Sequence, residues 1–351
     1  MRLPILYRFE ARALASFAIR GLATTLPAWL ALLQATHAQA QTERFPVSPT
    51  GIPYTVPAAA RAAGWTLAAL EARTALVGSN PVFLAGGATK ELAVDLAWQH
   101  RDIDESLALD RFESRITAIT GKLSTGSVAA GISYQRPFRA EVESASGPSQ
   151  HEMQVLLGAV AADVLPMLRV GVSLAGQFVE SVEDVTTYQA TVGAEMGAGP
   201  VLVAGAIKSQ PFGGDVAEVS EPGWFQLDAR AALGPMIALG ARLGVGWWND
   251  SLEGLLETPV DAGLGATFGV LPMLRVLGGV HHIRERLAQS STVPPMSVDE
   301  ALAGLDQGTF LDLGVMLGLP LANVTLAVED SHLFDTDSPS TWVTLSASAG
   351  F

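Results

Sequence analysis

The residues that most clearly could take part in chemistry are two adjacent histidines, His281 and His282. Imidazole nitrogens are common metal ligands, so a pair of them invites a metal-site hypothesis. The segment 273–284 that holds them is predicted to be a β-strand, however, and neighbouring side chains on a strand point to opposite faces. We therefore expect the two rings to be separated and predict no metal site from this pair.

Other catalytic patterns give no candidate. The sequence contains no cysteine, which excludes a thiolate metal site, a cysteine nucleophile and a disulfide scaffold. The span from Gly171 to Gly176 is one residue too long for the Gly-x-Ser-x-Gly turn of serine hydrolases. Gly263, Gly265 and Gly269 follow strand alternation, whereas a phosphate loop must turn into a helix. We predict a protein that is not an enzyme and has no cofactor.

Composition narrows the class of protein. Of the 351 residues 49% are hydrophobic and 16% are charged, and the net charge is −14. The negative charge argues against a nucleic-acid partner, and the hydrophobicity excludes an acidic disordered chain. Beyond the first forty residues, no segment offers the ~18 consecutive apolar residues of a membrane-spanning helix. The nearest, Val155 to Gly176, contains Asp163, Pro166 and Arg169.

The first forty residues resemble an export signal. A basic start with four arginines precedes an apolar stretch from Leu22 to Leu33, and Ala38-Gln39-Ala40 fits a signal-peptidase site. We predict a cleaved signal peptide over residues 1–40. An amphipathic N-terminal helix is the alternative.

The exported part has a hydrophobic period of two, which indicates strands with one apolar face. In residues 168–175 one parity carries Leu, Val, Val and Leu, and the other carries Arg, Gly, Ser and Ala. The string Val-Leu-Pro-Met-Leu-Arg-Val occurs at 164–170 and again at 270–276. Such alternation is typical of a β-barrel with lipid outside and polar groups inside.

Two kinds of connection separate the strands. Tight turns contain Pro166, Pro200, Pro235, Pro272 and Pro320, and acidic clusters such as 102–105, 141–143, 180–184 and 250–257 mark longer loops between them. Short turns at one rim and long polar loops at the other are the layout of outer-membrane barrels. We predict strands at 91–99, 111–120, 126–136, 151–162, 167–178, 186–196, 201–209, 224–233, 236–248, 259–269, 273–284, 308–318, 321–330 and 341–351.

The predicted fold is therefore all-β: a closed antiparallel transmembrane β-barrel of about 14 strands over residues 89–351, in the outer membrane of a Gram-negative cell among lipid and lipopolysaccharide. Twelve or sixteen strands, or a soluble β-sandwich or propeller, are the alternatives. The last strand ends in Phe351. A terminal amphipathic strand closing on Phe resembles the signal read by bacterial barrel-assembly machinery, which we expect as a partner.

Charged residues on the inward parity are nearly balanced in sign, which favours internal ion pairs over a strongly selective ion channel. Arg169 and Arg275 follow equivalent proline turns, so we expect both at the periplasmic mouth. The inward candidates are Asp95, Glu113, Arg115, Glu152, Arg169, Glu195, Lys208, Asp228, Arg230, Arg242, Asp261, Arg275, Asp312 and Glu329.

Residues 41–88 precede the first strand and show no strong alternation. A barrel of this size has an interior that must be filled or controlled, so we predict that 41–88 folds inward as a plug; a periplasmic tail is the alternative. Gly64 permits close backbone approach beside Trp65. Asn80 and Pro81 favour a turn, which we expect where the chain leaves the lumen.

One part of the chain also resembles a known group of proteins. The N-terminal region resembles the signature shared by FadL-type long-chain fatty-acid transporters and PorV/PorQ-like barrels. The matching parts are, in order, Ala60-Arg61-Ala62-Ala63-Gly64, then Asn80-Pro81-Val82-Phe83-Leu84-Ala85, and then Glu91-Leu92, which opens a strand. Both groups are fourteen-stranded barrels. The resemblance covers roughly residues 60–98 and implies a FadL-like or PorV-like architecture.

Three functions follow from this resemblance and the barrel. The first is passive transport of a hydrophobic small-molecule ligand past a movable plug, as in FadL-type proteins. The second is a PorV-like barrel that docks secretion-system partners or cargo without transport. The third is a general diffusion porin, which the predicted plug and the balanced lumen disfavour.

Overall fold

The computed structural model describes residues 45–46, 56–86, 89–101, 115–144, 147–180, 185–214, 219–220, 222–247, 258–283, 308–334 and 340–350. The signal-peptide prediction for residues 1–40, Glu113 and the terminal Phe351 lie outside these ranges.

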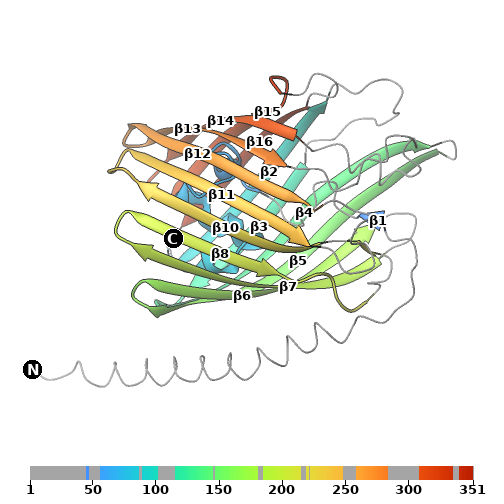
Figure 1. The fold of residues 1–351 in the computed structure, drawn as a ribbon, viewed down its shortest axis with the longest axis horizontal. Helices are drawn as coiled ribbons and strands as arrows, with labels where there is room; N and C mark the ends of the chain where they lie inside the picture. Colours follow the sequence, from blue (N-terminus) through green and yellow to red (C-terminus); the bar gives the residue numbers. More distant parts are fainter. Residues whose placement is uncertain are drawn as a thin grey trace, which may run out of the picture. The chain divides into compact units, whose positions relative to one another are not determined.

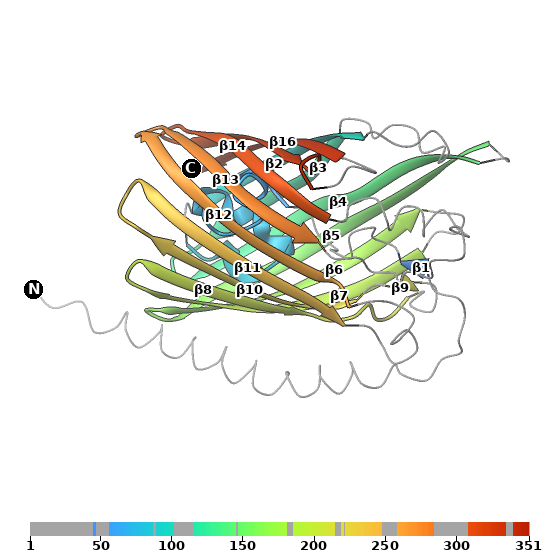
Figure 2. The ribbon, with the colours of Figure 1, turned by 45° about the horizontal axis from the view of Figure 1, so that its top comes forward.

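Fourteen antiparallel strands close into a barrel (Figures 1 and 2), which confirms the predicted strand number. Neighbours in sequence pair with one another, and β16 closes the ring against β2. The strands are β2 (Lys90–Arg101), β3 (Arg115–Ser124), β4 (Val128–Ser144), β5 (Gly147–Leu165), β6 (Leu168–Glu180), β7 (Val185–Ala198), β8 (Val201–Lys208), β10 (Gly223–Ala232), β11 (Ile237–Trp247), β12 (Val260–Leu271), β13 (Leu274–Ile283), β14 (Gly308–Gly318), β15 (Ala322–Asp330) and β16 (Ser340–Gly350).

Side chains alternate between the two faces of the wall as the period of two predicts. Along β11, exposed Leu239 and Leu243 face outward, while Ala238 and Arg242 are buried inside. The outward face carries large exposed apolar side chains on thirteen of the fourteen strands, among them Ile132, Leu156 and Leu264 at 69%, 55% and 68% exposure. An apolar surface of this extent requires lipid around it.

All five predicted proline turns are tight connections, at 166–167, 199–200, 233–236, 272–273 and 319–321. Because consecutive strands are antiparallel, these turns share one rim. One loop prediction was wrong: the acidic residues 141–143 lie within β4, which pairs with β5 as far as Ser144 and Gly147. The ladder resumes after a register shift between Gln135 and Phe138, where Pro137 lacks the N–H that regular pairing needs.

The described part of the N-terminal segment, residues 56–86, lies inside the ring of strands and is called the lumen segment below (Figures 1 and 2, blue). It contains one short helix, α2 (Ala58–Arg61), and two 3₁₀ helices, η1 (Leu70–Gly78) and η2 (Pro81–Leu84). Ahead of it, β1 (Phe45–Pro46) pairs in parallel with β9 (Val219–Ser220). No helix among the described residues is long and apolar enough to cross a membrane.

Candidate functional site

The lumen segment lies directly against a row of glycines on the inner wall. A Cβ at Gly263 or Gly265 of β12 would lie 1.9 Å from the carbonyl oxygen of Gly64 or Ala63, respectively. Similar clashes arise at Gly240, Gly279 and Gly314 on β11, β13 and β14. These five glycines, here called the glycine track, let the lumen segment approach the wall closely. Gly263, Gly265 and Gly279 meet its main chain, while Gly240 and Gly314 meet the side chains of Thr66 and Ala62. Sequence reasoning assigned the spacing of Gly263 and Gly265 to strand alternation alone.

Gly64 and Trp65 make the sharp bend that fits this track. Gly64 has φ 65°, and a Cβ there would lie 2.3 Å from the carbonyl oxygen of Leu264, so the expected close approach is confirmed. Trp65 has φ 60°, a left-handed conformation that a bulky residue adopts only when its surroundings enforce it. Its main-chain oxygen accepts a hydrogen bond from Arg242 at 3.3 Å.

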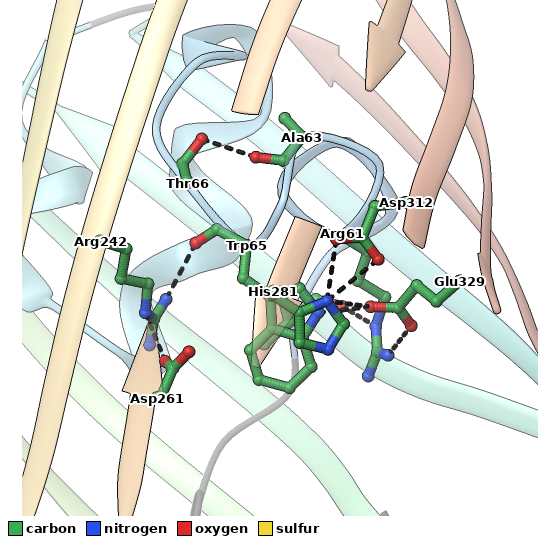
Figure 3. A network of polar contacts seen from close by, with 10 residues as sticks. Arg61, Ala63, Trp65, Thr66, Arg242, Asp261, His281, Asp312 and Glu329 are labelled. Carbon is green, nitrogen blue, oxygen red and sulfur yellow. Dashed lines mark hydrogen bonds and ion pairs between the residues drawn. The ribbon is translucent and has the colours of Figure 1, made fainter. Parts of the chain in front are cut away.

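The indole of Trp65 is fixed by a buried polar cluster on β13, β14 and β15 (Figure 3). Its Nε1–H donates to Glu329, which also pairs with Arg61 of α2. The ring stacks on His281 with centroids 4.6 Å apart, and Phe310 stacks on the other face of His281 at 4.7 Å. His281 Nδ1 lies 2.9 and 3.0 Å from the two carboxylate oxygens of Asp312.

A second cluster lies beside the first and holds the same bend. Arg242 Nε is 2.6 Å from an Asp261 oxygen, and Arg242 Nη2 donates to Gln226 at 3.0 Å. All three side chains are at least 95% buried. In Figure 3, Arg242 bridges Asp261 and the Trp65 carbonyl. Two predicted inward charges, Arg242 and Asp261, are thus brought together beneath the lumen segment.

The opposite end of the lumen segment is anchored through Asn80. Its side-chain oxygen accepts from the Val82 N–H at 3.1 Å and caps η2, while its Nδ2 donates to the Gly205 carbonyl at 3.1 Å. A Cβ at Gly193 would lie 1.8 Å from the Asn80 side chain. The expectation that Asn80 and Pro81 mark the exit from the lumen was wrong: both are buried, because Pro81 begins a 3₁₀ helix that continues inside.

Ion pairs secure this end near the rim of proline turns. Glu195 pairs with Arg73 of η1 and with Arg169, each at 2.7 Å, and Arg169 also pairs with Asp163 at 2.8 Å. Burial lowers the pKa of Arg73, and the charge of Glu195 partly offsets this effect. Glu195 thereby joins the barrel wall to the lumen segment, and Arg169 lies next to the turn at 166–167, as expected. Lys122 donates to the Gly86 carbonyl.

The remaining predicted inward residues are dispersed. Asp95 is buried and accepts from Ser346, whose oxygen in turn accepts from the Ala58 N–H. Lys208 is buried on β8, and Arg230 Nε lies 3.5 Å from the Ala68 carbonyl oxygen. Arg275 occupies an inward position of β13 next to the turn at 272–273. Arg115 begins β3 opposite Ala97, and its side chain lies outside the described residues.

The two histidines are separated by the wall, as the strand prediction required. His281 is 2% exposed inside, whereas His282 faces outward and contacts Thr309. Sequence reasoning did not single out Arg61 or Arg73, although both stand in the segment predicted to turn inward. Their positive charge could have identified them, since an arginine buried in the lumen needs a carboxylate partner.

A closed antiparallel barrel of fourteen strands with an apolar outer face defines a transmembrane β-barrel of the bacterial outer-membrane type. No protein-family model and no curated protein matches the sequence.

Solved structures with this fold include a FadL homologue from Pseudomonas aeruginosa, with TM-score 0.63 and 12% identity, covering 88% of this chain and 100% of that one. The toluene transporter TbuX from Ralstonia pickettii has TM-score 0.62 and 11% identity, over 86% of this chain and 99% of that one. The toluene transporter TodX from Pseudomonas putida has TM-score 0.59 and 10% identity, over 88% and 99%. The similarity at this identity is one of fold, and the fold is that of FadL-like barrels.

Proposed function

We propose that this chain is an outer-membrane channel for the passive transport of small hydrophobic molecules. The observation that carries the proposal is the fold, shared along nearly the whole length with a FadL homologue and with two proteins described as toluene transporters. The PorV-like docking barrel and the diffusion porin find no such support.

In this proposal the N-terminal region 41–88 acts as a plug, and its described part, the lumen segment, is the element that moves. The lumen segment is anchored by hydrogen bonds and ion pairs at two ends, through Trp65 and Arg61 at one and through Asn80 and Arg73 at the other. Contacts of this kind can be exchanged for water, whereas the ladder of the barrel cannot be opened at comparable cost. A hydrophobic ligand would pass as one end is released.

The rest of the assignment belongs to the same proposal. Residues 1–40 direct export and are removed, Phe351 is read by the assembly machinery, and the mature barrel resides in the outer membrane. The charged inward residues position the plug and perform no catalysis.

Uptake of radiolabelled toluene and of a radiolabelled long-chain fatty acid by cells that lack the gene tests the proposal. Restoring the gene should raise uptake of at least one of them in a saturable manner, and should leave uptake of a labelled disaccharide unchanged. Equal gains for the disaccharide would support a diffusion porin. Unchanged uptake of both apolar probes, together with recovery of secreted proteins on the purified barrel, would support the docking function.

A further inference from the structure

Arg61 and the carboxylates that it acts on carry more negative than positive charge. Asp95, Asp312 and Glu329 are at most 2% exposed. Arg61 pairs with Glu329 and acts electrostatically on the other two carboxylates. Three carboxylates thus face one guanidinium, while the adjacent Arg242 is engaged by Asp261. Uncompensated charge inside a protein is costly, and it is relieved either by protons on the carboxylates or by a further cation.

The backbone register places two of these carboxylates next to each other. Asp312 and Glu329 are directly opposite each other on β14 and β15, a position at which like charges repel. His281 comes from the next strand, β13, and its ring is clamped between Trp65 and Phe310. Its Nδ1 is therefore held towards both carboxylates, 2.9 Å from Asp312 and 4.0 Å from Glu329.

We propose that His281, Asp312 and Glu329 bind a divalent transition-metal ion, of which Zn²⁺ and Mn²⁺ are examples. One imidazole and two carboxylates are a donor set that these ions accept. The three ligand atoms lie within 4.8 Å of one another. Ligands around such an ion are roughly 3 Å apart, given metal–ligand bonds of about 2.0–2.2 Å. Glu329, which lies 4.0 Å from His281 Nδ1, therefore needs to approach it by about 1 Å, and the most widely separated pair of ligand atoms, up to 4.8 Å apart, needs to close by up to about 1.8 Å. Two positive charges would balance the surplus.

The ion would compete with one anchor of the lumen segment. Glu329 uses one carboxylate oxygen for Arg61 and the other, Oε1, for the Trp65 indole N–H. Oε1 is also the oxygen nearest to His281 Nδ1. Metal binding at Oε1 therefore competes with the Trp65 hydrogen bond and leaves the Arg61 ion pair in place. The metal site is argued from the inner wall alone and does not depend on the proposed transport.

The test is titration of the metal-depleted full-length barrel in detergent with Co²⁺, followed by its visible ligand-field bands, and with Zn²⁺ by calorimetry. One equivalent should bind, and His281→Gln and Asp312→Asn should each weaken binding about tenfold or more. The matched control is His282→Gln, which removes an imidazole one residue away on the outer face. Trp65→Phe keeps a stacking ring but frees Glu329 Oε1, so it should tighten binding by about tenfold.

Folding of each variant is monitored by its heat-modifiable migration in gels. If a variant does not fold, the Co²⁺ spectrum of the unaltered protein tests the proposal on its own. Absence of a Co²⁺ ligand-field band from the unaltered barrel would overturn the proposal. Equal affinity in His281→Gln and the unaltered protein would do so too, because the ion would then reside elsewhere, for example at the exposed pair of Asp330 and His332.

Discussion

Replacing one glycine of the track with alanine should unseat the lumen segment without opening the barrel. In Gly265→Ala, the new Cβ would lie 1.9 Å from the Ala63 carbonyl oxygen, more than 1 Å inside the 3.0 Å that real Cβ atoms respect. The obstacle is main chain on both sides, so no side-chain rotation relieves it. Overpacking of this kind costs about 3 kcal/mol. The ratio of seated to unseated segment should then fall by about two orders of magnitude.

The absence of native cysteine makes a direct assay available. Ala69 is 1% exposed, so Ala69→Cys should react slowly with a maleimide in the otherwise unaltered protein. Adding Gly265→Ala should accelerate labelling about a hundredfold. Adding Gly197→Ala should not, because Gly197 is an inward strand glycine whose Cβ would meet no atom closer than 4.0 Å. Equal labelling rates in all three proteins would refute the idea that the track seats the segment.

Three further predictions use the same structure. Arg61→Met leaves its buried carboxylate partners without a guanidinium, which should weaken seating by about 3 kcal/mol and raise conductance in planar bilayers; a channel as closed as the parent would contradict this. Asn80→Ala removes a helix cap and should speed hydrogen exchange at the amides of residues 82–84 by the equivalent of about 1 kcal/mol, whereas Asn80→Asp keeps the cap and should recover part of the protection; identical exchange in the two variants would count against the cap. Leu264→Arg, in the middle of a strand, should lower the unfolding free energy in vesicles by about 2–4 kcal/mol, and Leu321→Arg, equally exposed but at a turn, by about 0–1 kcal/mol; equal losses would refute the lipid assignment of the outer face.

The strand pattern was predictable because it is local. A period of two places each side chain on one face of the wall whatever the partner strand is, so the separation of His281 from His282 followed from sequence alone. The proline turns were equally predictable, since proline is excluded from the middle of a strand. The pairing of β4 with β5 beyond Pro137 could not be predicted, because it depends on which residues of the partner strand lie opposite after a register shift.

The candidate site divides in the same way. The inward orientation of Arg242, Asp261 and Glu195 could be predicted from parity, but their partners could not. Trp65 and Glu329 are separated by 264 residues, and Ala58 and Ser346 by 288. Such contacts exist only after β16 has paired with β2 and the ring has closed. The local alternation of the sequence is enough to assign each strand residue to a face. Which inward residues meet depends on closure of the barrel, because closure brings segments that are far apart in the sequence into one lumen.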